Sequence, residues 1–282
     1  MRDYTKELPP HTERYLGEHD LYLEIFEGEE QARGTGQKPP LLLVHGAYTG
    51  SWMWSKYIPH FIREGWTCYV MNLRGHYRSR VLDMTRLTFE DYLEDIREVL
   101  YEVIAERGEA PIVIGFSMGG ILSQKLAESE VLAGLVLMDS SVCREVHDLV
   151  PYSDLVPSIP GNVVPAPVRE EAASIDESAE DIAFQQKYLT MESARAFSAF
   201  SFFYGATGIP VDSRAVHCPC LVIHAVNTEE EDRRGQANAD YFRAEYSGLW
   251  NITHTGLLVG QRYLEGVQTV LEWLKRKIEP AR

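Results

Sequence analysis

The feature that most limits the fold is a series of short, continuously apolar runs separated by longer stretches with helical periodicity. A strand that is apolar at every position is buried on both faces of its sheet, which is typical of parallel sheets covered by helices. The runs lie at Leu41–Val44, Trp66–Met71, Ile112–Ile114, Leu135–Met138 and Leu221–Ile223. Their alternation with helical stretches predicts an α/β fold, with a mostly parallel central sheet flanked by helices.

Two of the intervening stretches have a clear helical pattern. Thr88 can cap the first, because Asp91 follows three residues later as in a capping box. The second, near the C-terminus, has an apolar stripe made of Val267, Leu271, Leu274 and Ile278. Earlier in the chain, Leu21–Phe26 alternates and predicts a half-exposed strand, and residues 29–39 predict a loop.

Residues 141–212 interrupt this alternation. They contain many prolines, an acidic patch at 170–181 and the apolar-aromatic run AFSAFSFFYG. Because no regular succession of strand and helix is visible, we expect an insertion of short helices. The chain would then consist of a core formed by residues 1–140 and 213–282, and an insertion formed by residues 141–212.

The composition argues against several classes of partner. The formal net charge is −15, and a surface of this sign repels nucleic-acid phosphates and anionic lipids. The N-terminus lacks the apolar segment of a signal peptide, and no run is as long as a transmembrane helix. We therefore expect a cytoplasmic protein without nucleic-acid or membrane partners. The cysteines, at positions 68, 143, 218 and 220, do not have zinc or redox spacing, and neither a metal nor an organic cofactor is expected.

The stretch PIVIGFSMGG, residues 111–120, places a serine between glycines where an apolar run gives way to a helical pattern. Gly-x-Ser-x-Gly between strand and helix is the arrangement of a nucleophile elbow, in which Ser117 projects from a strained turn. Gly115 and Gly119 would let the strand and the helix approach closely. The N–H of Met118, at the start of the helix, is expected to point toward an oxyanion formed there.

An oxyanion hole needs a second N–H, which should come from the loop after Leu41–Val44. That loop begins with His45, Gly46 and Ala47, and Gly46 allows the backbone to turn. We assign the N–H of Ala47 as the second donor. We expect His45 to be structural and to form a hydrogen bond with the loop.

These motifs resemble the α/β-hydrolase fold superfamily, in particular its serine esterases and lipases, over almost the whole chain. HGAYTGSWMW is similar to the H-G-x-x-x-x-x-x-W segment of small esterases and hydroxynitrile lyases. NLRGHYRSR is similar to the R-G-H-G-x-S turn of the family, with Tyr77 in place of the usual glycine. The resemblance implies that the insertion, which follows the sixth strand of the family's order, is a helical cap that roofs the pocket and selects the substrate.

A serine needs a general base within hydrogen-bond reach, and the order in the family is serine, acid, histidine. His254 follows an apolar, strand-like run and precedes the last helix, which is where the family keeps its base. We therefore assign His254 as the base. His217 and His224 flank or lie in the apolar run at 221–223, and we interpret both as structural.

The acid has two candidate positions. The family's usual aspartate would follow the run at 221–223, but in VIHAVNTEEEDR this position is Thr228, and Ala225 replaces a glycine. Asp139, at the end of the run at 135–138, keeps the expected chain order, and we favour it. The alternative is one of the carboxylates that follow Thr228, namely Glu229, Glu230, Glu231 and Asp232.

The catalytic residues expected are thus Ser117, His254 and Asp139. They predict a serine hydrolase that forms an acyl-enzyme from a small or medium carboxylic ester, lactone or thioester with an apolar part. Aromatic side chains expected in the substrate pocket are Tyr48, Trp52, Phe202 and Phe203. Two alternatives stay open: a hydroxynitrile-lyase-like enzyme or C–C hydrolase on the same fold, and an inactive relative that only binds a ligand. The missing carboxylate at Thr228 is the feature that keeps the inactive relative open as an alternative.

Overall fold

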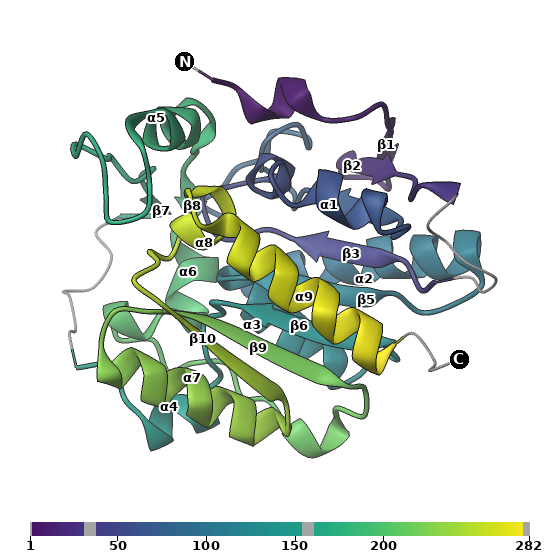
Figure 1. Cartoon of the computed structure of the whole chain (residues 1–282). Coiled ribbons are helices and arrows are strands. Elements are labelled where there is room, and N and C mark those ends of the chain that lie inside the picture. The colour runs from purple at the N-terminus through teal and green to yellow at the C-terminus, as the bar shows by residue number, and fades with distance from the viewer. Residues whose placement is uncertain (1, 31–37, 154–160, 279–282) are drawn as a thin grey trace.

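A twisted central sheet runs through the molecule (Figure 1). The computed structural model describes residues 2–30, 38–153 and 161–278, so residues 31–37 of the loop expected at 29–39 lie outside the described part. Within it, the sheet comprises β1 (Thr12–Leu16), β2 (Leu21–Phe26), β3 (Leu41–Val44), β4 (Cys68–Met71), β5 (Ile112–Phe116), β6 (Gly134–Met138), β9 (Cys220–Val226) and β10 (Glu245–Trp250). Their order across the sheet is β1-β2-β4-β3-β5-β6-β9-β10. Only the pairs β1–β2 and β2–β4 of this sheet are antiparallel, which confirms the mostly parallel sheet predicted from the sequence.

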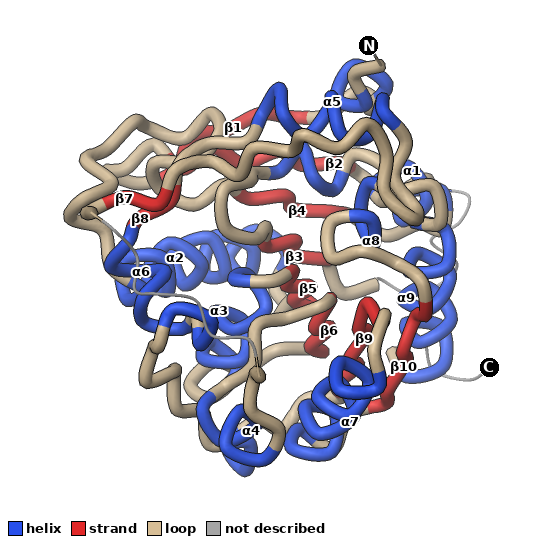
Figure 2. The backbone as a smooth tube through the Cα atoms, turned by 90° about the vertical axis from the view of Figure 1, so that its left-hand side faces the viewer, coloured by secondary structure: helices blue, strands red, loops and turns tan. Residues whose placement is uncertain are grey.

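Helices cover both faces of the sheet, with α2 and α3 on one side and α9 on the other (Figure 2). The first face packs against α2 (Phe89–Arg107), α3 (Met118–Ala127) and α7 (Glu229–Phe242). The second packs against α1 (Ile58–Arg63), α8 (Gly256–Val259) and α9 (Tyr263–Lys277). Short 3₁₀ helices lie at Tyr4–Glu7, Ser51–Trp54, Phe202–Tyr204 and Ser213–Ala215. The predicted capping box of α2 is present, since Thr88 and Asp91 each accept a hydrogen bond from the backbone N–H of the other.

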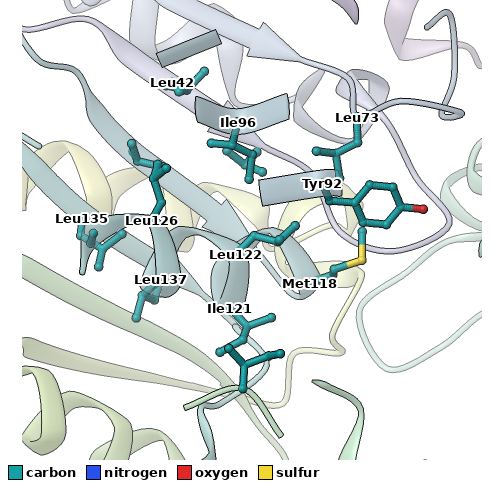
Figure 3. Close-up of a cluster of buried hydrophobic side chains, with 14 of the residues drawn as sticks. Leu42, Leu73, Tyr92, Ile96, Met118, Ile121, Leu122, Leu126, Leu135 and Leu137 are labelled. Carbon is teal, nitrogen blue, oxygen red and sulfur yellow. The ribbon is translucent and has the colours of Figure 1, made fainter. Parts of the chain in front are cut away.

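The apolar runs are continuous because the sheet separates two cores. Successive side chains of a strand point to opposite faces, so Leu42 enters one core while Leu41 and Leu43 enter the other. Figure 3 shows the first core, where strand residues meet apolar residues of α2 and α3; Leu42, Leu135, Leu137, Tyr92, Ile96, Ile121, Leu122 and Leu126 are among the residues labelled. Burial on both faces therefore fixes each strand in register and brings the carboxyl ends of β3, β5, β6 and β9 together.

The strand predicted at Leu21–Phe26 is present as β2, but the expectation that it is half-exposed is wrong, because every residue of β2 is buried. Residues distant in the sequence cover its second face. His11 stacks on Phe26 with 4.3 Å between the ring centroids, and its Nε2 lies 3.4 Å from Glu24. Arg78 lies over the ring of Tyr22, 4.3 Å from the centroid.

The described residues of the segment 141–212 include short helices, together with a small two-stranded sheet that was not expected. The helices are α4 (Arg144–Leu149), α5 (Ala179–Tyr188) and α6 (Ala194–Phe200). The strands β7 (Val163–Val164) and β8 (Glu192–Ser193) pair antiparallel. Ser178 and Asp181 form a capping box at the start of α5, which explains a helix in a segment rich in acidic residues.

A buried carboxylate joins this insertion to the sheet. Glu192 of β8 is fully buried and accepts hydrogen bonds from His76 Nε2 at 2.9 Å, from the Tyr92 hydroxyl at 2.6 Å and from the Tyr48 N–H at 3.2 Å. Burial favours the neutral carboxyl, but the charge of His76 outweighs it and lowers the pKa of Glu192. Burial likewise disfavours the imidazolium, but Glu192 raises the pKa of His76. The two groups therefore form a buried, oppositely charged pair that also holds the loop at Tyr48.

We expect Glu192→Gln to lower the free energy of unfolding by about 3 kcal/mol, because it leaves His76 buried without its counter-charge. Urea unfolding measures the loss, and Glu272→Gln, at an exposed position of α9, is the matched control. The lowered pKa of Glu192 means that its contribution is lost as pH falls through its folded-state pKa. The raised pKa of His76 means that the contribution of His76 to stability is lost as pH rises through its folded-state pKa. The difference between wild type and variant should therefore be largest between the ordinary pKa values, 4.5 and 6.5.

An equal stability of Glu192→Gln and Glu272→Gln at pH 5.5, roughly midway between those ordinary values, would contradict this assignment.

Candidate active site

Ser117 occupies a strained turn between β5 and α3. Its backbone has φ +54° and ψ −117°, a region that residues other than glycine rarely adopt. The neighbouring glycines make this turn possible: a Cβ at Gly115 would lie 2.4 Å from the carbonyl oxygen of Gly119, and a Cβ at Gly119 would lie 2.4 Å from that of His45. The strand, turn and helix expected from the sequence are thus present, and the serine stands at the carboxyl end of the parallel strands.

The structure brings Ser117, His254 and Asp139 into one hydrogen-bonded chain. His254 Nε2 lies 3.0 Å from Ser117 Oγ, and His254 Nδ1 lies 2.5 Å from Asp139 Oδ2. The imidazole stacks on Phe116, with 4.7 Å between the ring centroids. Its side chain is 49% exposed, so the ring is open to a ligand on one side. An arrangement of this kind lets an imidazole take the proton of a serine hydroxyl while a carboxylate fixes its tautomer.

Residues of the insertion hold the loop that carries His254, which lies between β10 and α8. Asp176 Oδ1 accepts hydrogen bonds from the Thr253 N–H at 3.1 Å and from its hydroxyl at 2.8 Å. The Thr255 hydroxyl donates to Glu177 at 2.8 Å. The residues on either side of His254 are therefore fixed by two adjacent carboxylates of the insertion.

Asp139 follows β6 in a left-handed conformation, with φ +40°. Its carboxylate is buried and has partners at both oxygens: Oδ2 contacts His254, while Oδ1 lies 2.7 Å from His224 Nδ1 and accepts the Ala225 N–H at 3.1 Å. Burial alone would raise the pKa of Asp139, but His224 and then His254 outweigh it and hold that pKa well below its ordinary value. Asp139 is therefore ionised and faces two imidazoles.

The carboxylates at 229–232, the alternative acids, lie in the first turn of α7, and in the described part of the chain none of them contacts His254. Thr228 is the N-cap of α7, and Glu231 completes its capping box. Glu230 pairs with Arg234 at 2.5 Å, and Asp232 accepts a hydrogen bond from the Tyr246 hydroxyl at 2.7 Å. The Thr228 position that lacks the family's aspartate thus serves to start a helix.

The two backbone amides expected to bind an oxyanion flank Ser117. Met118 is the first residue of α3, where backbone N–H groups lack partners within the helix. The loop with Ala47 passes close by, since a Cβ at Gly46 would lie 3.0 Å from the Cβ of Ser117. As expected, His45 forms a hydrogen bond with this loop: its Nδ1 lies 2.8 Å from the Gly46 carbonyl oxygen, while its Nε2 accepts the Leu73 N–H at 3.1 Å.

A cavity of about 440 Å³ opens beside Ser117 and His254. Core and insertion both contribute to its lining, which includes the aromatic residues Tyr48, Phe116, Tyr152, Phe197, Phe200 and Phe203. Of the aromatic side chains expected to line the pocket, Tyr48 and Phe203 do so. Trp52 and Phe202 were assigned wrongly: Trp52 is buried between Phe184 and Tyr188, and Phe202 stacks on His147.

Sequence reasoning missed His224 as a member of this site. It lies in β9, a strand that is buried along its whole length, so its burial resembles that of an ordinary core residue and only the distance to Asp139 distinguishes it. Among residues 2–30, 38–153 and 161–278, no group of three His, Cys, Asp or Glu side chains could hold a metal ion. In the same part of the chain, no helix is long and apolar enough to cross a membrane.

We expect His45 to stay neutral from pH 8 down to about pH 5, unlike an ordinary histidine, whose pKa is about 6.5. Its burial, and then the nearby charge of His76, lower the pKa of His45 to about 3. Since Nε2 accepts the Leu73 N–H, the ring proton must be on Nδ1. Imidazole ¹⁵N spectra recorded against pH should show this single tautomer of His45 throughout that range. A His45 midpoint above pH ~5 would refute the expectation.

Comparison with known proteins places this geometry in a family. A sequence model described as the Alpha/beta hydrolase family matches residues 41–265. The thermostable monoacylglycerol lipase of Bacillus sp. (strain H-257) is 33% identical over 127 residues, which are 42% of this chain and 47% of that enzyme. Protein phosphatase methylesterase 1 of Bos taurus is 26% identical over 137 residues, which are 46% of this chain and 36% of that protein. These curated relatives are thus matched over less than half of their length.

Solved structures have a similar fold to this chain over nearly its whole length. A thermophilic esterase from Thermogutta terrifontis superposes with a TM-score of 0.65 at 19% identity, covering 96% of this chain and 100% of that one. The monoacylglycerol lipase of Paleococcus ferrophilus gives a TM-score of 0.65 at 15% identity, covering 91% and 99%. At these identities the likeness concerns the fold, and the family rests on the sequence model that spans β3 to α9. The chain belongs to the α/β hydrolase family.

Proposed function

We propose that this protein hydrolyses a carboxylic ester, with Ser117 as nucleophile, His254 as general base and Asp139 as the acid that orients the base. One observation carries the proposal: the continuous hydrogen-bonded chain from Ser117 Oγ through both nitrogens of His254 to the ionised Asp139, beside a cavity. Two of the relatives described above, a monoacylglycerol lipase and a methylesterase, support an ester as the substrate class.

In the first half of the reaction, His254 Nε2 takes the proton of the Ser117 hydroxyl as Oγ attacks the carbonyl carbon of the ester. Asp139 keeps the other ring proton on Nδ1 and stabilises the imidazolium that forms. His254 then gives its proton to the leaving alcohol, and an acyl-Ser117 ester remains. In the second half, a water molecule attacks this ester with His254 again as base, and the carboxylic acid leaves.

The N–H groups of Ala47 and Met118 bind the negative oxygen of each tetrahedral intermediate. Removing one such donor costs enzymes about 10²–10³ in kcat, so the position of the Ala47 loop matters for the rate. His45 holds that loop through its hydrogen bond with the Gly46 carbonyl oxygen. Glu192 of the insertion also holds it, because it accepts a hydrogen bond from the Tyr48 N–H. The donors are thus fixed before a substrate arrives.

The insertion, residues 141–212, acts in this proposal as a cap over the core formed by 1–140 and 213–282. Its Leu189, Phe197 and Phe200 line the cavity together with Phe116 and Ala225 of the core. The volume of about 440 Å³ suits a small or medium substrate, and the aromatic lining suits an apolar acyl or alcohol part. The same chemistry extends to lactones and thioesters of similar size.

We expect Ser117→Ala to abolish the hydrolysis of p-nitrophenyl butyrate, with a loss of about 10⁴-fold or more, because no other group replaces the nucleophile. Ser141→Ala is the matched control, since Ser141 also lines the cavity and its loss should change the rate by less than about tenfold. A serine-directed phosphonate should add to wild type and not to Ser117→Ala, as measured by intact mass. Turnover that survives in Ser117→Ala would refute the assignment.

The acid is tested by a set of isosteric variants. Asp139→Asn should lower kcat by about 10⁴-fold, because the amide stabilises the wrong tautomer of His254. Glu231→Gln and Asp232→Asn, from the alternative cluster, should stay within about tenfold of wild type, as should the exposed Glu229→Gln. Steady-state rates and circular dichroism of each variant separate a catalytic loss from unfolding. A large loss confined to one of the α7 variants would move the acid to that residue.

The cavity predicts a dependence on acyl length. With p-nitrophenyl esters from acetyl upward, kcat/KM should rise by roughly fourfold for each methylene that enters the apolar cavity, which corresponds to about 0.8 kcal/mol. It should level off or fall once the cavity is filled. Rates that are highest for acetate and fall from there would show that the cavity does not bind the acyl chain.

A further inference from the structure

The buried acid of the site has two imidazole partners, and the reaction proposed above uses only one of them. Both histidines contact Asp139 through Nδ1: His254 at Oδ2, 2.5 Å away, and His224 at Oδ1, 2.7 Å away. The Ala225 N–H also donates to Oδ1, at 3.1 Å. His224 comes from β9 and His254 from the loop after β10, so two neighbouring strands each supply a ring to the same carboxylate.

The ionisation of Asp139 fixes the proton on His224. An ionised carboxylate only accepts hydrogen bonds, so His224 Nδ1 must carry a proton in this contact. Nε2 is then the only nitrogen of His224 at which a proton can be gained or lost. His224 is buried, with 8% of its surface exposed, and it lines the cavity next to Ser117 and His254.

We propose that His224 is a positioning residue of this site, which acts through Asp139 on His254 in two ways. It locks the carboxylate so that Oδ2 faces His254, and its charge state sets how much of the negative charge of Asp139 the catalytic imidazole experiences. The proposal rests on the proposed function for its kinetic consequences and on the contacts above for its structural ones.

The locking follows from the partners of each oxygen. Asp139 can rotate its carboxylate about the Cβ–Cγ bond unless both oxygens are held. His224 and the Ala225 N–H hold Oδ1, and this leaves Oδ2 for His254. His254 has few restraints of its own, since its side chain is 49% exposed and packs on Phe116 alone among the aromatic residues described. The placement of its ring therefore depends on how well Asp139 is held.

The electrostatic effect follows from competition for one negative charge. When His224 is protonated, two cations share Asp139, and the imidazolium that forms at His254 during the reaction is stabilised less. Burial lowers the pKa of His224, but the charge of Asp139 and its hydrogen bond outweigh burial and raise that pKa above its ordinary value. Among the described residues, the charged groups that act on His224 are Asp139, Arg234 and Glu231, and Tyr246 also lies near it, since a Cβ at Gly235 would contact both residues.

Two substitutions separate the two effects. His224→Asn keeps an N–H donor near Oδ1 but cannot become charged, whereas His224→Phe keeps a ring and removes the donor. For His224→Asn we expect a kcat at high pH within a few-fold of wild type, and an acidic limb of the kcat/KM profile that moves to higher pH, because Asp139 then acts on His254 alone. For His224→Phe we expect a loss of about 10²-fold in kcat with little change in KM, because Asp139 is misplaced.

The exposed His217→Asn is the matched control and should change neither the rate nor the pH profile. If both His224 variants keep the wild-type rate and profile, or if both lose activity equally without a shift of the acidic limb, the proposal is wrong and His224 is only a core residue. Urea unfolding of each variant shows whether a loss of rate reflects unfolding.

A readout independent of activity distinguishes this proposal from the proposed function. In imidazole ¹H–¹⁵N spectra of Ser117→Ala, both His224 and His254 should show a protected Nδ1 proton, and Asp139→Asn should remove the protection of both. In His224→Asn, the chemical shifts of the His254 ring should change relative to the unsubstituted background, whereas His217→Asn should leave them unchanged. If no ester is hydrolysed but these spectra behave as stated, the proposed function fails and the positioning role stands. If esters are hydrolysed and the His254 spectra do not respond to His224, the positioning role fails.

Discussion

The site is organised by one buried negative charge. Asp139 follows β6, yet its partners come from other elements: His224 and the Ala225 N–H from β9, and His254 from the loop after β10. A carboxylate in this environment is stable only when its oxygens are fully hydrogen-bonded, because burial strongly disfavours an unpaired charge. Satisfying Asp139 therefore requires the carboxyl ends of these strands to lie side by side, and the same contacts hold His254 against Ser117.

The sheet stabilises two unfavourable backbone conformations at the site. Ser117 and Asp139 both have positive φ, and they follow neighbouring strands whose last residues, Phe116 and Met138, are paired in register. The Ser117 N–H donates to the Met138 carbonyl oxygen at 3.2 Å, and the Ser141 N–H donates to the Ser117 carbonyl oxygen at 3.1 Å. Backbone hydrogen bonds thus tie the two unfavourable turns to each other, and the buried strands behind them resist relaxation.

The strands β3, β5, β6 and β9 could be predicted because burial on both faces leaves only apolar residues in them. The residues of β2 were predicted correctly but its burial was not, since an alternating pattern does not reveal that His11 and Arg78 cover its second face. Ser117 and His254 could be chosen as candidates from turn chemistry and chain order, whereas the choice between candidate acids depended on distances that no local pattern encodes. Trp52 and Phe202 show the same limit: aromatic spacing does not separate a core side chain from one in a cavity.

Glu192 and Asp176 were not identified from the sequence either, because an acidic residue in an irregular segment resembles a solvated one. In the structure, Glu192 holds the Tyr48 N–H beside one wall of the cavity, and Asp176 holds Thr253 beside the other. Exchanging residues 141–212 for the corresponding segment of a homologue would thus remove both of these contacts. The aromatic side chains that line the cavity can vary without disturbing them.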